Sequence, residues 1–450
     1  MTSATQSRGP IGVRVRELAA GAPIESVVLA LAVPPLFLHA TYQPHVSIPL
    51  ASTSVDVTLA DVAIAAVLVA AVLRGRRDGF APLRSARGVL LAAAVLVALG
   101  LLSLATPAAL GEEYGYATHT VSALKFAWYA LLLPATLVLV RSGAEARPLF
   151  AGVVAWSTVA TAVGALQFLG LVSEFQGRRP GQREPSIVGI HDFAALSGAA
   201  LVLGLAGLAL GAARPLGRRW TTAAIGVGGL GVVLSGALTG AGGVWLAAVA
   251  ILLLARSRGT VGRRQVAVTA AVVLTVTAGT MLMRATAIER FAEFLGLRDR
   301  IEDTGVESYA HRTLLAYIGV RIWLDHPVAG VGWQASSEDW AYEPYLADAR
   351  ARFPDEPDQA FPSPAHRWWV QNLYLQVLAD AGVIGFAALV ALFAVAVRAA
   401  ARGARGSPVP VVGLAWMLVA AGVWAGIGLV PGIPLDALTW LALGLVTVRG

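Results

Sequence analysis

The sequence predicts an all-α, polytopic integral membrane protein with about 12 transmembrane helices and a large, partly helical extracytoplasmic loop. The chain of 450 residues is 57% hydrophobic and only 14% charged, whereas a soluble domain carries roughly a quarter charged residues. Apolar blocks of about 20 residues, long enough to cross a hydrocarbon core of ~30 Å, alternate with short arginine-bearing connectors. Backbone polar groups in lipid must be satisfied within the segment, so these blocks are expected to be helices.

The order of the apolar blocks divides the chain into four regions. Residues 1–23 form a cytoplasmic N-terminal segment, 24–283 hold transmembrane helices 1–9, 284–368 form the large extracytoplasmic loop, and 369–450 hold helices 10–12. The expected helices cover residues 24–41, 56–73, 87–106, 119–140, 149–171, 191–212, 219–235, 238–255, 265–283, 369–397, 409–429 and 433–448. An uncleaved first helix is favoured over a signal peptide, because Pro34 and Pro35 interrupt the first apolar run.

The distribution of arginine orients these helices. Alternate connectors are rich in arginine, whereas the connectors at 42–55, 107–118, 236–237 and 430–432 contain none. The positive-inside rule therefore predicts a multi-pass protein of the cytoplasmic (inner) membrane with both termini in the cytoplasm and the active site facing outward. The net charge of +7 is explained by these membrane-edge arginines, so no nucleic acid partner is expected. The chain has no cysteine, which excludes disulfides and thiolate metal sites.

The outer connectors at 172–190 and 284–368 contain arginine and so break this pattern, although the second is too long to obey charge rules, and a single lysine lies within a helix. Arg178, Arg179 and Arg183 lie in a short outward-facing connector, where they either solvate the surface or bind an anion. Lys125 lies inside the fourth expected helix, about two turns from its outer end. It either extends its ammonium group to the outer surface or adds a positive charge to an outward-facing anionic site.

The large loop contains an amphipathic helix over residues 309–325. Its apolar stripe can lie on the membrane or on neighbouring helices, and it comprises Leu314, Leu315, Ile318 and Ile322. The opposite face carries Arg312, Ala316, Gly319 and Trp323. This face is either an ordinary surface or a ligand site, since a guanidinium group grips phosphate bidentately and the Trp323 ring offers a plane for a sugar. The segment 336–364 is expected to be irregular and to act as a lid.

A glycine-containing turn follows the amphipathic helix, and a polar ridge opens the tenth membrane helix. Pro327 stops the amphipathic helix, and Gly330 and Gly332 permit a tight turn. Polar groups at membrane depth are costly and face a cavity or a partner helix, and here they are Asn372, Gln376 and Asp380. His366 lies just outside this helix.

The paired strings HRTLLAYIGVRIWLDHPVAGVGW and QNLYLQVLADAGVIGF resemble the O-antigen ligase and O-antigen polymerase superfamily. The matching positions are Asp325, Pro327, Gly330 and Gly332, then Asn372, Tyr374, Leu375, Leu378, Gly382 and Gly385. The resemblance implies a membrane glycosyltransferase that is inverting and metal-independent, with no cofactor. It also implies an undecaprenyl-diphosphate-linked glycan as donor, and a glycan or lipid acceptor.

The resemblance also implies roles for particular residues. Arg312 and Arg183 would bind the diphosphate, which agrees with the basic connector and with the arginine on the open helix face. The full set of candidate substrate-binding residues is Arg183, Arg312, Arg179, Asn372, Tyr374, Trp323 and Lys125. The candidate catalytic residues are His366, Arg312, Gln371 and His311, and no metal ligand is expected.

One departure from the family pattern concerns the catalytic base. The family has a histidine immediately before the asparagine of the second string, and this chain has Gln371 there. Glutamine cannot act as a base near neutral pH. Either His366 or His311 replaces the base, with His366 favoured, or the chain is inactive or needs no base. The Ser-Arg pair of the family's hairpin region is also absent, with Thr239, Gly240 and Ala241 in its place.

These observations favour glycan transfer to an acceptor hydroxyl outside the cytoplasmic membrane, by a ligase or a polymerase. The alternatives are a membrane transporter of a small anion or a lipid-linked intermediate, and a non-catalytic member of the family. A transporter is expected to show internal repeats and a site near the bilayer midplane. The candidate residues instead gather near the outer surface, which favours the transferase.

Overall fold

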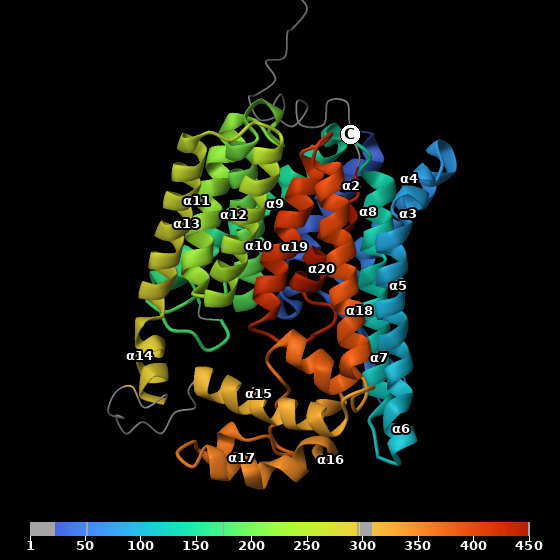
Figure 1. The fold of residues 1–450 in the computed structure, drawn as a ribbon, viewed down its shortest axis with the longest axis vertical. Helices are drawn as coiled ribbons and strands as arrows, with labels where there is room; N and C mark the ends of the chain where they lie inside the picture. The colour runs from blue at the N-terminus through green and yellow to red at the C-terminus, as the bar shows by residue number, and fades with distance from the viewer. Residues whose placement is uncertain (1–22, 51–52, 174, 295–296, 298–307, 449–450) are drawn as a thin grey trace, which may run out of the picture.

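A computed structural model describes residues 23–50, 53–173, 175–294, 297 and 308–448, and these residues form a bundle of long apolar helices (Figure 1). Among these described residues, seven helical stretches are long and apolar enough to cross a membrane: Arg87–Leu110 (α5 to α6), Tyr116–Leu139 (α7 and α8), Gly143–Phe168 (α9), Ile190–Ala209 (α10), Leu238–Ser257 (α12), Arg263–Met283 (α13) and Leu373–Gly403 (α18). Three shorter apolar helices are Ile24–Leu36 (α2), Val409–Trp424 (α19) and Pro434–Leu445 (α20). The multi-pass helical membrane fold is therefore confirmed.

The expected ranges all overlap a helix, but the twelve-span topology stays a prediction. The remaining two expected spans correspond to α3 (Leu59–Asp78) and α11 (Arg218–Ser235), which are helical but are not among the stretches that satisfy both length and hydropathy. The tight turn expected between the seventh and eighth helices is confirmed, since α11 ends at Ser235 and α12 begins at Leu238. Gly236 between them has φ +58°, a conformation that favours glycine.

A short hairpin that the sequence analysis did not predict lies after α2, in a fold that is otherwise helical. Strands β1 (His45–Leu50) and β2 (Thr53–Thr58) pair antiparallel, with His45 opposite Thr58. Alternating β-branched residues in this connector favour strands. The sequence analysis used the connector only for its lack of arginine and so did not predict these strands. The next helix consequently begins at Leu59 and not at residue 56. Its start is capped by Thr58, whose backbone N–H donates to the Asp61 carboxylate at 2.8 Å.

Helix α10 forms the centre of the bundle and packs against α9, α11, α12 and α19. Nearly every residue of α10 is buried by these neighbours. Small residues let the helix backbones approach closely, which substitutes for a hydrophobic driving force within a membrane. A Cβ atom on Gly228 of α11, for example, would lie only 2.4 Å from the backbone nitrogen of Leu201 in α10.

The large loop folds at one end of the bundle. It contains α14 (Ala285–Phe294), α15 (Ser308–Asp325), α16 (Asp339–Tyr342) and α17 (Leu346–Arg352), whereas α4 (Ala81–Ser85) lies at the opposite end (Figure 1). The apolar stripe of α15 is buried as expected, in a second, small hydrophobic core that includes Tyr342, Tyr345 and Phe361. The segment expected to be irregular, 336–364, thus contains two short helices and supplies part of this core.

Helix α18 is kinked at Gly382, and the turn after α15 fills the kink. Gly382 has φ +61° and ψ −164°, so the backbone groups around it leave the helical hydrogen-bond ladder. Four backbone bonds replace those lost: Val331 N to Ala379 O, Gly332 N to Asp380 O, Val383 N to Pro327 O and Ile384 N to Val328 O. Because an unsatisfied backbone group at membrane depth costs several kcal/mol, this exchange fixes the loop to α18. The two strings that carry the family resemblance are therefore physically paired.

Candidate functional site

Four arginines from separate segments lie together where the loop meets the bundle, and we call them the arginine cluster. The α9–α10 connector supplies Arg178 and Arg183, the end of α13 supplies Arg284, and α15 supplies Arg312. The turn between α11 and α12 separates two of them, since a Cβ atom on Gly236 would lie 2.8 Å from the Cβ of Arg183 and 3.4 Å from the Cδ of Arg284. Residues far apart in sequence thus form one basic group.

Arg312 is held by two neutral side chains. Its Nε donates to Oε1 of Gln371 at 3.0 Å, and its Nη2 donates to Nε2 of His191 at 3.2 Å. A guanidinium group can only donate, so Nε2 of His191 must be unprotonated and accept. The guanidinium is therefore oriented without being neutralised.

The cluster carries more positive than negative charge. Burial, and secondarily the other arginines, lower the pKa of Arg183 to about 9. Burial also lowers the pKa of Arg178, whereas the charge of Glu184 beside it acts in the opposite direction. Within the described residues, the Nε atoms of Arg178, Arg183 and Arg284 are buried without a hydrogen-bond partner. A cluster of this kind favours the binding of an anion, which would pair with the positive charges and accept hydrogen bonds from the unpartnered N–H groups.

The two histidine candidates for the base differ in their surroundings. His311 is buried beside Arg312, and burial, followed by the arginine charge, lowers the pKa of His311 to about 4. Its ring meets Trp368 edge-on at 4.8 Å between centroids, and its Nε2 has no hydrogen-bond partner among the described residues. His366 is exposed at the loop surface, with its ring 6.1 Å from that of Trp368.

Three of the predicted binding residues lie apart from the contacts just described. Arg179 is exposed beside the half-buried Arg178. Lys125 lies 3.5 Å from the Asp61 carboxylate and donates to the Asp56 carbonyl at 3.3 Å, so it fastens α7 to the strand–helix junction at α3. Trp323 is half-buried on α15, and its Nε1 has no partner in the described part of the chain.

The predicted polar ridge of α18 has its partners within the protein. Asn372 caps α18 by accepting from the backbone nitrogens of Tyr374 and Leu375, and its Nδ2 donates to Ala425 O. The Tyr374 hydroxyl donates to Ala421 O at 2.7 Å.

Further along the helix, Gln376 Nε2 donates to Asp380 at 3.1 Å, and Asp380 also accepts the backbone N–H groups of Gln334 and Ser336. These contacts hold α18 against α19 and the loop. Because the polar side chains of α18 have hydrogen-bond partners within the protein, their burial is explained without a ligand.

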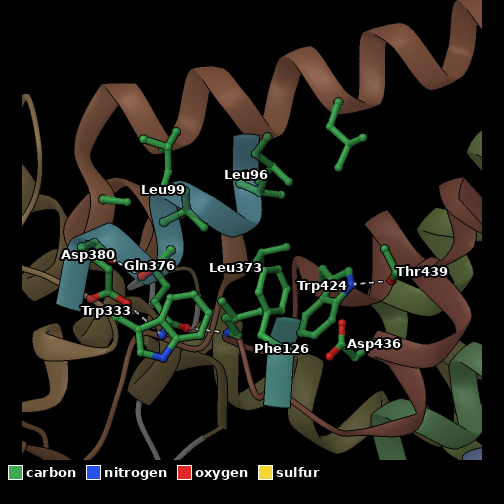
Figure 2. A pocket seen from close by; sticks show the side chains of 18 of the residues that line it. Leu96, Leu99, Phe126, Trp333, Leu373, Gln376, Asp380, Trp424, Asp436 and Thr439 are labelled. Carbon is green, nitrogen blue, oxygen red and sulfur yellow. Dashed lines mark hydrogen bonds between the residues drawn. The ribbon is translucent and has the colours of Figure 1, made fainter. Parts of the chain in front are cut away.

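A separate cavity of about 70 Å³ lies between α5, α7, α18 and α20 (Figure 2). Figure 2 shows Leu96 and Leu99 on one side, Phe126 and Trp333 across from them, and Asp380 at one end. Its lining is almost entirely apolar, and no arginine or lysine of the described residues contributes to it. This cavity therefore lacks the cations that a diphosphate needs, and the arginine cluster is the stronger candidate site.

Sequence reasoning missed Arg284 and His191, and it did not select Arg178. Arg284 stood at a helix end, where arginine is ordinary, and only the packing of α13 beside the α9–α10 connector brings it to Arg183. His191 is the first residue of the expected helix 191–212, and its position in the sequence does not indicate a contact with Arg312. A usable signal was present in Arg178, which belongs to the basic connector that opposes the topology rule.

Residues 223–390 match the family described as O-antigen ligase. The match runs from α11 to the middle of α18 and includes Arg284, Arg312 and Gln371. The resemblance to the O-antigen ligase and polymerase superfamily is thereby confirmed. No curated protein matches the chain. Among the residues that the structure describes, no three His, Asp or Glu side chains lie together as a metal site would require.

Proposed function

Residues 223–390 match the O-antigen ligase family, and from that premise we propose that the chain transfers a glycan from undecaprenyl diphosphate to an acceptor hydroxyl outside the cytoplasmic membrane. The observation that carries the proposal is the arginine cluster. A lipid diphosphate brings several anionic oxygens to the membrane surface, and the four guanidinium groups of the cluster offer the complementary charge.

The cluster serves the bond-breaking half of the reaction. The acceptor oxygen forms a bond to the anomeric carbon as the bond from that carbon to the diphosphate oxygen breaks, so negative charge accumulates on the leaving diphosphate. Arg183, Arg284 and Arg312 stabilise this charge as it develops, and preorganised donors of this kind are worth roughly 3–4 kcal/mol each in other enzymes. Attack from the face opposite the leaving group inverts the anomeric centre.

The other half of the reaction is removal of the acceptor proton. Gln371 cannot take this proton, and its bond to Arg312 suits it instead to hold the guanidinium toward the diphosphate. We keep His366 as the first candidate for the base and His311 as the second. His366 is solvent-accessible and can meet an acceptor that arrives from outside, whereas the pKa of His311, near 4, makes it a weaker base.

Analysis of a deletion strain tests the proposal directly. Mass spectrometry is expected to show loss of one cell-surface glycan and accumulation of the corresponding undecaprenyl-diphosphate-linked precursor. Complementation with the wild-type chain should reverse both changes. Arg312→Ala should fail to complement, and Arg312→Lys should complement poorly, because lysine lacks the bidentate fork. A deletion strain with unchanged glycan and no accumulated precursor would exclude this function.

A further inference from the structure

A groove of about 630 Å³ lies within the large loop. It runs between α15, the end of α14 and the segment after α17. Its lining includes three aromatic rings and a polar rim: Phe294, Tyr317 and Phe353, with Arg352, Asp355 and Glu356. The helix face that it covers begins at Thr313, the residue next to Arg312.

Aromatic rings connect the groove to the arginine cluster without interruption. The guanidinium of Arg284 lies over the Tyr309 ring, 4.9 Å from its centroid. From there a row of rings, which we call the aromatic ladder, continues with centroid separations between 5.4 and 6.0 Å through Tyr309, Phe291, Phe294, Phe353 and Tyr317. The last three of these rings line the groove.

The exposure of the ladder distinguishes it from the core of the loop. Tyr342 and Phe361, which belong to that core, are 1% and 2% exposed. All five ladder rings are only half-buried, so part of each ring is available to another molecule. A half-exposed aromatic ring beside hydrogen-bonding side chains suits a sugar, since one face of a sugar presents C–H groups and its edge presents hydroxyls.

We infer that this groove binds the oligosaccharide of the lipid-linked donor, beyond the sugar that carries the diphosphate. The inference rests on the proposed function. Continuity with the arginine cluster identifies the donor as the occupant, because a glycan whose diphosphate lies at Arg284 and Arg312 begins where the ladder begins. The rings contact the sugar faces, and the rim of Arg352, Asp355 and Glu356 meets the hydroxyls.

The test uses two probes prepared from the deletion strain and the purified full-length protein. Mild acid releases the free oligosaccharide from the accumulated precursor, and undecaprenyl diphosphate without a glycan serves as the second probe. Phe353→Ala and Tyr317→Ala should each weaken oligosaccharide binding at least tenfold and leave undecaprenyl diphosphate binding unchanged. Thr313→Trp, at an exposed position of the groove, should block the oligosaccharide by filling the space. Arg284→Ala should instead weaken the binding of undecaprenyl diphosphate and leave oligosaccharide binding unchanged.

The matched control is Tyr116→Ala, which removes an exposed aromatic ring at the start of α7, outside the groove. It should leave the binding of both probes unchanged. Oligosaccharide binding that survives Phe353→Ala, Tyr317→Ala and Thr313→Trp, with melting temperatures like the wild type, would overturn the inference. Binding of undecaprenyl diphosphate without any binding of the oligosaccharide would also overturn it and leave the proposed function standing. Failure of both probes on the wild type would reject the two together.

Discussion

At the scale of single residues, the arginines of the cluster differ from arginines that stabilise a fold. An arginine that stabilises a fold is normally paired, as Arg74 is with Glu145 at 2.6 Å. Within the described residues, the buried Nε atoms of Arg178, Arg183 and Arg284 lack hydrogen-bond partners, and the charges of neighbouring arginines lower the pKa of both Arg178 and Arg183. Such an arrangement costs stability without an anion, and binding an anion recovers it.

Replacing Arg284 tests whether this arginine serves ligand binding or the stability of the fold. Arg284→Ala removes one repelling charge and one cation–π contact of about 0.5–1 kcal/mol, so the melting temperature of the ligand-free protein should change little. The affinity for undecaprenyl diphosphate should fall roughly tenfold or more, since hydrogen bonds to charged groups contribute about 1.5–3 kcal/mol. The control is Arg321→Ala on α15, which removes an exposed ion pair with Asp348 on α17. This variant should bind undecaprenyl diphosphate like the wild type. A large drop in melting temperature with unchanged affinity would assign Arg284 a structural role.

The base assignment makes a kinetic prediction. His366→Ala should reduce the turnover rate about a hundredfold while donor binding is retained, because general-base assistance contributes ~10²–10⁴-fold. His311→Ala should have the smaller effect. Turnover is measured with the purified precursor and a defined acceptor, and donor affinity is measured separately. Full activity in His366→Ala together with an inactive Gln371→Ala would show that positioning, and not proton abstraction, is what this segment provides.

Burial of His311 predicts a pH dependence of stability. Its pKa of about 4 in the folded protein lies below the ordinary histidine value of 6.5, so the unfolded chain binds more protons between these values. The contribution of neutral His311 is therefore present above about pH 6.5 and is lost as the pH falls toward 4. Thermal unfolding should show a smaller loss between pH 7 and pH 4.5 in His311→Gln than in wild type. His45→Gln, at an exposed histidine, should keep the wild-type dependence.

At the scale of elements, the kink of α18 explains why the turn after α15 and the first half of α18 lie together. A Cβ atom on Gly382 would lie 2.2 Å from Val328 O, and one on Gly330 would lie 2.4 Å from the Asp380 carbonyl carbon. Both glycines also have positive φ. The sequence predicted the turn and the helix but not their contact, because the spacing of glycines does not reveal which backbone groups lie opposite them.

Alanine in place of either glycine should therefore destabilise the protein strongly. Gly382→Ala and Gly330→Ala should each lower the melting temperature markedly, since backbone strain alone costs about 1–3 kcal/mol and the clash adds to it. Gly226→Ala is the matched control, because its Cβ would meet nothing within 4 Å and its φ is ordinary. It should melt within a few degrees of wild type. Equal melting of Gly382→Ala and Gly226→Ala would contradict the interlocked kink.

At the scale of the whole molecule, the orientation in the membrane is the central prediction. Arginine-rich connectors are expected inside and the loop 284–368 outside. Truncated fusions to alkaline phosphatase after residue 345 should be active, because that enzyme matures outside the cytoplasm. Fusions of a fluorescent protein after residue 405 should fluoresce in the cytoplasm. A cytoplasmic signal at residue 345 would overturn the outward-facing site.

The sequence by itself determined the helical membrane fold, the approximate helix ranges and the family, since hydropathy, arginine spacing and the two strings are local properties. It also selected Arg183 and Arg312 as candidate binding residues. Only the tertiary structure decided that Arg284 and His191 join them, that Lys125 pairs with Asp61 instead, and that Gln376 and Asp380 fasten the loop. These are contacts between distant segments, and such contacts depend on how helices pack, which periodicity and composition do not specify.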